Sequence, residues 1–220
     1  MTEKKEKNTE LFIQFAIIVV LVGLLMYGIG KGGGSSTTNS GGINSQAIIE
    51  SVSASEILPT GVPKIYGDEL KIRYDDISAT NSQSTEATIS KLTQIDVSET
   101  LKGAELERYV RIGSAIACEY CCGAKTLIFS DGSPACGCAH SYAMRGLAKY
   151  LIKFHGDEFT DEQILEELGK WKVLFFPDIH EQKAAILKSQ GIELNYINLA
   201  SNKYRGIETG QSSGSMVGGC

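Results

Sequence analysis

The fold of this chain is organised around the stretch Cys118-Glu-Tyr-Cys121-Cys122-Gly-Ala-Lys-Thr-Leu-Ile-Phe-Ser-Asp-Gly-Ser-Pro-Ala-Cys136-Gly-Cys138-Ala-His140. Five of the six cysteines and one of the three histidines fall within these 23 residues. The spacing is C-x2-C-C, then 13 intervening residues, then C-x-C-x-H. This clustering predicts that the two groups of thiols meet in one site, with ligands that a soft metal ion prefers.

The segment between the two cysteine groups favours a short hairpin. Residues 125–130 are apolar and rich in strand-forming types, and Asp131-Gly132 is a hairpin turn signal. Residues 104–117 before it and 139–155 after it carry apolar side chains at helical spacing. We therefore predict an α+β fold that is mainly helical, with a Cys-rich hairpin between two amphipathic helices.

Six side chains are candidate metal ligands: Cys118, Cys121, Cys122, Cys136, Cys138 and His140. Zinc takes four N or S ligands in a tetrahedron, usually as two pairs. The first pair would come from Cys118 and Cys121 on a tight turn. The second would come from Cys136 with Cys138 or His140 near a helix start, where the helix dipole stabilises thiolates. In this scheme Cys122 is the thiol most dispensable to a four-ligand site.

The number of thiols leaves the metal open. Zinc needs four ligands, so five thiols and an imidazole exceed what one zinc ion takes. Cu(I) prefers thiolates, and this set is large enough for more than one Cu(I) ion. An iron–sulfur cluster needs four cysteines, but the spacing matches none of the usual patterns. Zinc is the first expectation.

The turn, hairpin and helix in this order resemble a treble-clef zinc finger. That resemblance implies one zinc ion held by a pair of ligands from the turn and a pair from the helix start. This chain departs from the family in its second pair, which is C-x-C rather than C-x2-C, and in the additional Cys122.

A second resemblance concerns Pro134-Ala135-Cys136-Gly137-Cys138 with His140 close behind. It is similar to the motif of small membrane-attached lipoproteins named for a Pro-Cys-Tyr-Cys-Gly-Cys sequence, although Ala135 replaces the tyrosine and the preceding cysteine is absent. Over residues 100–180 the chain also looks like an uncharacterised type of Cys-rich, membrane-anchored prokaryotic protein, in particular an archaeal one. These resemblances imply a metal-related class and no particular activity.

Two other interpretations of the thiols stay open. Structural disulfides suit a domain that faces an oxidising compartment, and Cys118 or Cys121 would pair with Cys136 or Cys138, because a bridge between adjacent Cys121 and Cys122 is strained. The domain would then be a disulfide-stabilised interaction module. Alternatively, the C-x2-C pair Cys118 and Cys121 would carry thiol–disulfide exchange. A non-enzymatic role is the first expectation. Catalysis would have to use the thiols, because no Ser-His-Asp order, phosphate loop or dinucleotide fingerprint is present.

Residues 11–30 are predicted to form a single transmembrane helix. They make a 20-residue apolar run in which Gln14 is the only strongly polar side chain, and a helix of that length spans about 30 Å. A cleaved signal peptide is the alternative, but residues 27–30 lack a small-residue cleavage pattern. More lysines precede the span than follow it closely, which predicts a cytoplasmic N-terminus and an extracytoplasmic C-terminal domain.

The remaining boundaries follow from composition. Residues 1–10 form the cytoplasmic N-terminus, the Gly/Ser-rich residues 31–44 a linker, residues 45–200 the Cys/His domain and residues 201–220 a flexible tail. The net charge is −5 and no basic tract occurs, so nucleic acid is not an expected partner. The expected partners are the membrane through residues 11–30, a metal ion and a protein partner of unspecified kind.

Elsewhere, residues 86–95 and 160–176 are predicted to form helices. The second would begin with a capping box at Thr160 and end before Pro177. A further helix would be capped by Asp178 and end near Gly191. Short strands are expected at residues 70–74 and 194–199. Further assignments concern single side chains. Trp171, Phe175 and Phe176 are assigned to the core, Arg145, Lys149 and Lys153 to a solvated helix face, and His155 and His180 to helix caps or the surface.

Overall fold

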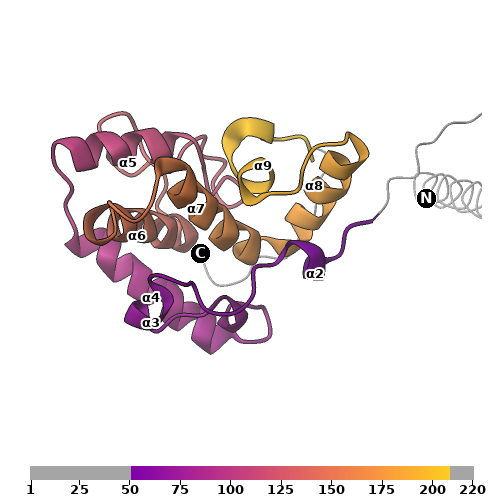
Figure 1. Ribbon diagram of the computed structural model, residues 1–220, viewed down its shortest axis with the longest axis horizontal. Helices are drawn as coiled ribbons and strands as arrows, with labels where there is room; N and C mark the ends of the chain where they lie inside the picture. The colour runs from indigo at the N-terminus through magenta and orange to yellow at the C-terminus, as the bar shows by residue number, and fades with distance from the viewer. Residues whose placement is uncertain (1–50, 209–220) are drawn as a thin grey trace, which may run out of the picture. The chain divides into compact units, whose positions relative to one another are not determined.

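Helix α6, Ala139–Phe154, lies at the centre of the fold and packs against α4, Ser82–Ser98, α5, Ala104–Ser114, and α7, Asp161–Phe175. The structure is a computed structural model, and it describes residues 51–208 (Figure 1). The two helices that flank the cysteine stretch are therefore packed on each other, as their apolar faces predict.

The other elements are short or lie at the edge of this group. They are α2, Ala54–Ile57; α3, Gly67–Leu70; η1, Tyr74–Asp76; α8, Pro177–Ser189; α9, Tyr196–Ala200; and η2, Asn202–Tyr204. Helix α9 packs on α7, and α2 packs on α8. The chain after α9 therefore returns towards the cysteine stretch, where Asn202 N–H donates to the carbonyl of Ala115 at 2.8 Å.

The predicted helix starts are mostly confirmed. Thr160 and Gln163 form the expected capping box of α7, which ends at Phe175 before Pro177. The prediction that Asp178 caps the next helix is wrong. Helix α8 begins at Pro177, because proline has its φ angle already set for the first helical position and needs no N–H donor there.

Both short strand predictions are wrong, and with them the β part of the predicted fold class. Residues 70–74 contain the end of α3, a left-handed Lys71 with φ 51°, and the start of η1. Asn195 caps α9 by accepting a hydrogen bond from the N–H of Asn198. Within residues 51–208 the only β pairings are the isolated bridges Ile116–Ser201 and Ile128–Pro134. An apolar–polar alternation of five or six residues favours a strand too weakly to outweigh these local capping contacts.

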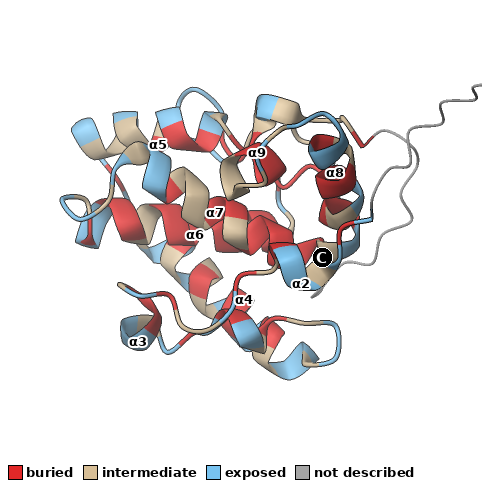
Figure 2. Ribbon diagram, turned by 45° about the vertical axis from the view of Figure 1, so that its right-hand side comes forward, coloured by how far each residue is buried: buried red, intermediate tan, exposed pale blue. Residues whose placement is uncertain are grey.

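The core surrounds α6 and α7 (Figure 2). Trp171, Phe175 and Phe176 are fully buried, as predicted. The indole N–H of Trp171 donates to the hydroxyl of Tyr66 at 2.8 Å, so this large side chain is also satisfied as a hydrogen-bond donor. His155 is the C-cap residue of α6, as predicted, and contacts the carboxylates of Glu69 and Glu158.

The prediction of a solvated basic face on α6 is wrong for Arg145 and Lys149, whereas Lys153 is exposed. Arg145 is fully buried, and its guanidinium lies 2.9 Å from the carboxylate of Asp96 on α4. Lys149 Nζ lies 2.8 Å from the same carboxylate. Lys153, one turn further, contacts Glu99 at 2.5 Å. The three basic side chains at four-residue spacing therefore form a seam of ion pairs between α6 and the C-terminal part of α4.

Glycine at position 146 permits the close approach of α6 to α4. A Cβ atom added there would lie 1.8 Å from the carbonyl oxygen of Leu92 and 3.1 Å from the amide nitrogen of Asp96. Since both neighbours are backbone atoms, neither can move away by changing a rotamer. The two helices would have to separate.

We expect Gly146→Ala to destabilise the protein by at least the roughly 1 to 3 kcal/mol typical of overpacked cores. Gly137→Ala is the matched control, because a Cβ atom at Gly137 would meet nothing within 4 Å. Urea unfolding followed by circular dichroism measures both. Equal midpoints for the two variants would contradict the close packing of α4 and α6.

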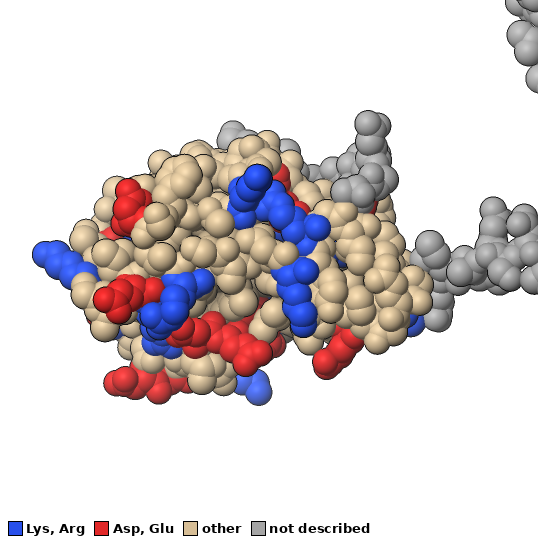
Figure 3. Space-filling model, turned by 90° about the horizontal axis from the view of Figure 1, so that it is seen from above, with Lys and Arg blue, Asp and Glu red and all other residues tan. Residues whose placement is uncertain are grey.

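Charged side chains on the surface are mixed in sign. Figure 3 shows lysines and arginines next to aspartates and glutamates on the face viewed there. Among the helices within residues 51–208, none combines the length and the apolar composition that a bilayer span requires. The predicted span at residues 11–30 lies outside the described residues.

Candidate metal centre

The first two ligand candidates lie on a tight turn just after α5. The N–H of Tyr120 donates to the carbonyl of Cys118 at 2.6 Å, and that of Gly123 donates to the carbonyl of Glu119 at 2.7 Å. Glu119 has a φ angle of 46°, a conformation that non-glycine residues seldom adopt. This turn reverses the chain between Cys118 and Cys121 and brings both thiols to the same site.

The segment that follows is a loop with one hairpin bridge rather than a pair of strands. The N–H of Leu127 donates to the carbonyls of Gly113 and Ile116 at 3.0 and 2.9 Å, which attaches the loop to the end of α5. Its reversal lies at the predicted turn, where Gly132 has a φ angle of 83°. Ala135 N–H then donates to the carbonyl of Leu127 at 3.1 Å, so the loop returns the chain to the cysteines.

The second group of ligand candidates is held at the start of α6. Cys138 is the N-cap residue, and its Sγ accepts a hydrogen bond from the N–H of Ser141 at 3.4 Å. His140 lies in the first turn, fully buried, with its ring centroid 4.8 Å from that of Phe175 and 5.0 Å from that of Phe176. The buried Arg145 donates to the carbonyl of Cys136 at 2.8 Å and so fixes the preceding loop.

These segments bring four ligand atoms together. One atom each from Cys118, Cys121, Cys138 and His140 lies within 4.8 Å of the other three. The Sγ atoms of Cys118 and Cys138 are 3.4 Å apart, and Sγ of Cys121 is 3.4 Å from Nδ1 of His140. A tetrahedral zinc ion with Zn–S bonds of about 2.3 Å places its sulfur ligands about 3.8 Å apart. The arrangement therefore fits one tetrahedral ion after small adjustments.

The remaining two thiols of the cluster are bonded to each other. Cys122 and Cys136 form a disulfide, in which Cys122 is exposed and Cys136 is buried. The predicted pairing of Cys118 or Cys121 with Cys136 or Cys138 is therefore wrong, and Cys136 does not join the four-ligand group in this state. The turn after Cys118 directs Cys121 towards His140 and leaves the next residue, Cys122, facing Cys136.

Cys138 is the thiol best prepared to bind a cation. A hydrogen bond from the Cys118 thiol, with further contacts from His140 and Ser141, holds the pKa of Cys138 well below its usual value. The same contact raises the pKa of Cys118, and burial acts in the same direction. Without a cation the pair therefore holds one negative charge, and a bound metal ion would replace the shared proton.

A buried network of charged side chains adjoins the centre through Glu119. The Glu119 carboxylate lies 3.0 Å from Nζ of Lys172, whose side chain is fully buried, and 3.7 Å from the guanidinium of Arg205. Lys172 also donates to the carbonyl of Ala200 at 2.9 Å. Burial lowers the pKa of Lys172 to about 8, although Glu119 and Cys118 oppose this shift.

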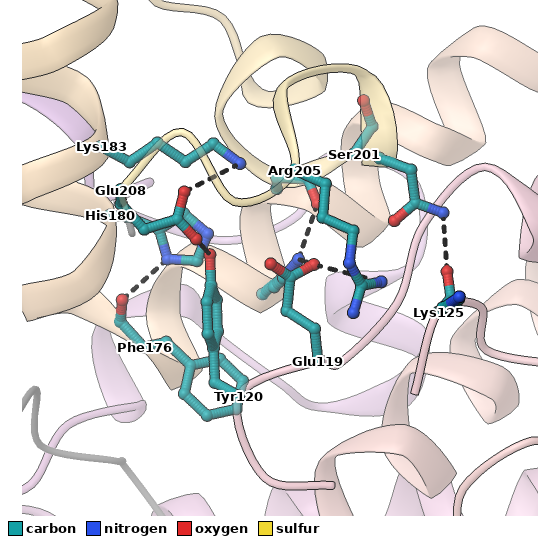
Figure 4. A network of polar contacts seen from close by, with 12 residues as sticks. Glu119, Tyr120, Lys125, Phe176, His180, Lys183, Ser201, Arg205 and Glu208 are labelled. Atoms are coloured by element: carbon teal, nitrogen blue, oxygen red, sulfur yellow. Dashed lines mark hydrogen bonds and ion pairs between the residues drawn. The ribbon is translucent and has the colours of Figure 1, made fainter. Parts of the chain in front are cut away.

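The network continues through Tyr120 to α8 (Figure 4). The hydroxyl of Tyr120 donates to Glu208 at 2.8 Å, and Nζ of Lys183 lies 3.9 Å from the same carboxylate. His180 contacts the carbonyl of Phe176 through Nδ1 at 2.7 Å, and burial lowers its pKa, so it is neutral. The sequence-based assignment of His180 to a cap or the surface is wrong. Residues 201–208, assigned to a tail from composition, are packed here.

Sequence reasoning did not identify this network or the buried Arg145. One signal was present for Lys172, which stands inside the apolar run Trp171 to Phe176 where a solvated lysine is not expected. Glu119 and Glu208 gave no comparable signal, because they lie in polar loops distant in sequence from Lys172 and Lys183.

Comparison with protein-family models, curated proteins and solved structures gives no match. The resemblances to treble-clef zinc fingers and to the lipoprotein motif therefore stay predictions, and function must be argued from the site itself.

Proposed function

We propose that this chain is a membrane-tethered, extracytoplasmic metal-binding protein that holds one divalent ion, zinc, through Cys118, Cys121, Cys138 and His140. The observation that carries the proposal is the convergence of these four ligand atoms within 4.8 Å of one another. Three thiolates and one imidazole are an established ligand set for structural zinc.

The buried charge next to the centre favours a divalent ion. A divalent ion with three thiolates and a neutral imidazole carries one net negative charge. The adjoining network contains three cationic side chains, Lys172, Lys183 and Arg205, against two carboxylates, Glu119 and Glu208, which leaves one positive charge. The two charges offset each other, whereas Cu(I) in the same ligands would leave a second negative charge in a region of low dielectric constant.

The ligand set also favours a structural or storage role over catalysis. Catalytic zinc sites keep one coordination position for water or substrate, while four protein ligands complete a tetrahedron. Cys118 and His140 are fully buried, which limits the approach of a substrate to the ion.

The location rests on sequence and on the disulfide. Residues 11–30 form an apolar run of the length that a membrane anchor requires, and the lysine bias around it favours an extracytoplasmic Cys/His domain. The Cys122–Cys136 disulfide supports this orientation, because disulfides persist in oxidising compartments and are rare in the cytosol.

Metal titration tests the proposal. We expect the full-length protein in mild detergent, handled anaerobically with its disulfide intact, to bind one Co²⁺ ion with the absorption bands of tetrahedral thiolate coordination. Excess Zn²⁺ should displace it. His140→Asn and Cys121→Ser each remove a ligand, so each should weaken binding by more than the roughly 10- to 100-fold that loss of a supporting side chain costs.

The matched control is the double variant Cys122→Ser with Cys136→Ser, which removes two cysteines of the same cluster and leaves all four ligands. It should bind one ion with the same spectrum. Absence of Co²⁺ binding by the native protein, or a spectrum unchanged in His140→Asn, would contradict the proposal.

A further inference from the structure

We infer that the Cys122–Cys136 disulfide masks a second metal site, which forms when the disulfide is reduced and which shares the thiolate of Cys138 with the first. This inference rests on the proposed function, because the shared ligand is one of the four that hold the first ion. The oxidised chain would then bind one metal ion and the reduced chain two.

Two overlapping groups of ligand atoms support the second site. Besides the four-ligand group, the Sγ atoms of Cys122, Cys136 and Cys138 also lie within 4.8 Å of one another. Cys138 belongs to both groups. Its Sγ is 3.4 Å from Sγ of Cys118 on one side, and its N–H donates to Sγ of Cys136 at 3.5 Å on the other. A thiolate has several lone pairs and can bridge two soft ions, so this position suits a shared ligand.

The disulfide is accessible from one side. Cys122 is exposed, whereas Cys136 is buried, so an external thiol would approach the disulfide from the side of Cys122. Gly123 follows Cys122 and Gly137 follows Cys136, and a Cβ atom added at either glycine would meet nothing within 4 Å. The space around this end of the cluster is therefore open to an incoming reductant and then to an ion.

A dithiol reductant supplies the two electrons that reduction of the disulfide requires. One thiolate of the dithiol attacks Sγ of Cys122, the bond between Cys122 and Cys136 breaks, and Cys136 leaves as a thiolate. The second thiol of the reductant then displaces Cys122 and closes the reductant's own disulfide. Two electrons pass from the dithiol to the protein, and both cysteines become available as ligands.

The second site would select a soft, thiophilic ion. Its three ligands are all thiolates, without imidazole or carboxylate, and such sets favour Cu(I) over zinc. The chain would thereby respond to thiol redox conditions by changing both the number and the kind of ions that it carries.

The number of Cd²⁺ ions bound per chain, before and after reduction, tests the inference. The full-length chain is prepared in mild detergent with Cys220→Ser, so that the cysteine outside the described residues cannot contribute. One sample keeps the disulfide, and another is reduced with dithiothreitol that is removed anaerobically by gel filtration. Both are loaded with ¹¹³Cd²⁺ and freed of excess ion. We expect one ion per chain before reduction and two after it, with two ¹¹³Cd resonances that are mutually coupled through the shared sulfur.

The matched control is Cys122→Ser with Cys136→Ser in the same background, which should bind one ion under both conditions. One ion in the reduced native chain would overturn the inference and leave the proposed function standing. Two uncoupled resonances, or two ions in the double variant, would overturn the shared site. No ion in the oxidised chain would instead contradict the proposed function.

Discussion

Chelation of the ion at the Cys118–His140 centre is expected to lower the melting temperature of the protein substantially. A ligand that binds only the folded state stabilises it by about 4 kcal/mol when its free concentration is about 1,000 times its dissociation constant. For a domain of 150 to 250 residues, each kcal/mol shifts Tm by about 2 to 4 °C, so the expected decrease is about 8 to 16 °C. Structural zinc sites bind tightly enough to reach this ratio easily.

The physical reason is that the ion adds four ligand bonds between the turn after α5 and the start of α6, beside the Cys122–Cys136 disulfide and the packing of α5 on α6. Cys118 and Cys121 lie on the turn after α5, and Cys138 and His140 begin α6, while the intervening loop contains one β bridge. Since α6 packs on α4, α5 and α7, loss of its first turn should also disturb the surroundings of Trp171. Fluorescence of Trp171, the single tryptophan of the chain, should therefore follow the transition.

The measurement is thermal unfolding of the anaerobic full-length protein with saturating zinc or with a strong chelator. Cys118→Ser is the comparison: it should melt at the lower temperature and respond little to the chelator. The double variant Cys122→Ser with Cys136→Ser should keep the chelator response, because the disulfide does not supply ligands to the first site. A native protein with the same Tm in zinc and in chelator would refute a stabilising ion.

Asp96→Asn is expected to destabilise the protein by about 3 to 5 kcal/mol, the usual effect of removing one partner from a buried ion pair. The Asp96 carboxylate lies 2.9 Å from the guanidinium of Arg145, whose side chain is fully buried, and 2.8 Å from Nζ of Lys149. An amide keeps the shape and removes the charge, so Arg145 would stay buried without a counter-ion. Arg145 also holds the carbonyl of Cys136, so the metal centre should lose affinity as well.

Glu99→Gln is the matched control, because it is the same change of carboxylate to amide in the same seam of ion pairs. Its partner is Lys153, and both side chains are partly solvated, with relative exposures of 24% and 34%. Such pairs contribute about 1 kcal/mol or less. Urea unfolding of both variants, with metal titration of each, provides the comparison. Equal losses of stability would show that burial does not distinguish the two pairs.

The sequence by itself determined the position of the site and the helices around it. Apolar periodicity over residues 104–117 and 139–155 predicted α5 and α6, because patterns of that length outweigh local alternatives. The cysteine spacing predicted that the two cysteine groups would meet. Its second ligand pair was Cys136 with Cys138 or His140, whereas the structure brings Cys138 and His140 to Cys118 and Cys121. The apolar–polar alternations at residues 70–74 and 194–199 were too short to be decisive. They predicted strands, but helical turns form at both places.

Only the tertiary structure decided which thiols pair and what surrounds them. Cys136 was as good a ligand candidate as Cys138 in sequence, but the loop fixed by Arg145 turns Cys136 towards Cys122. Arg145 itself has the spacing of a solvated face and is buried because Asp96 on α4 meets it. Similarly, Glu119 and Lys172 are 53 positions apart and become an ion pair when the turn after α5 packs on α7. These choices depend on contacts between distant segments, and the local pattern of a chain does not encode the distances between them.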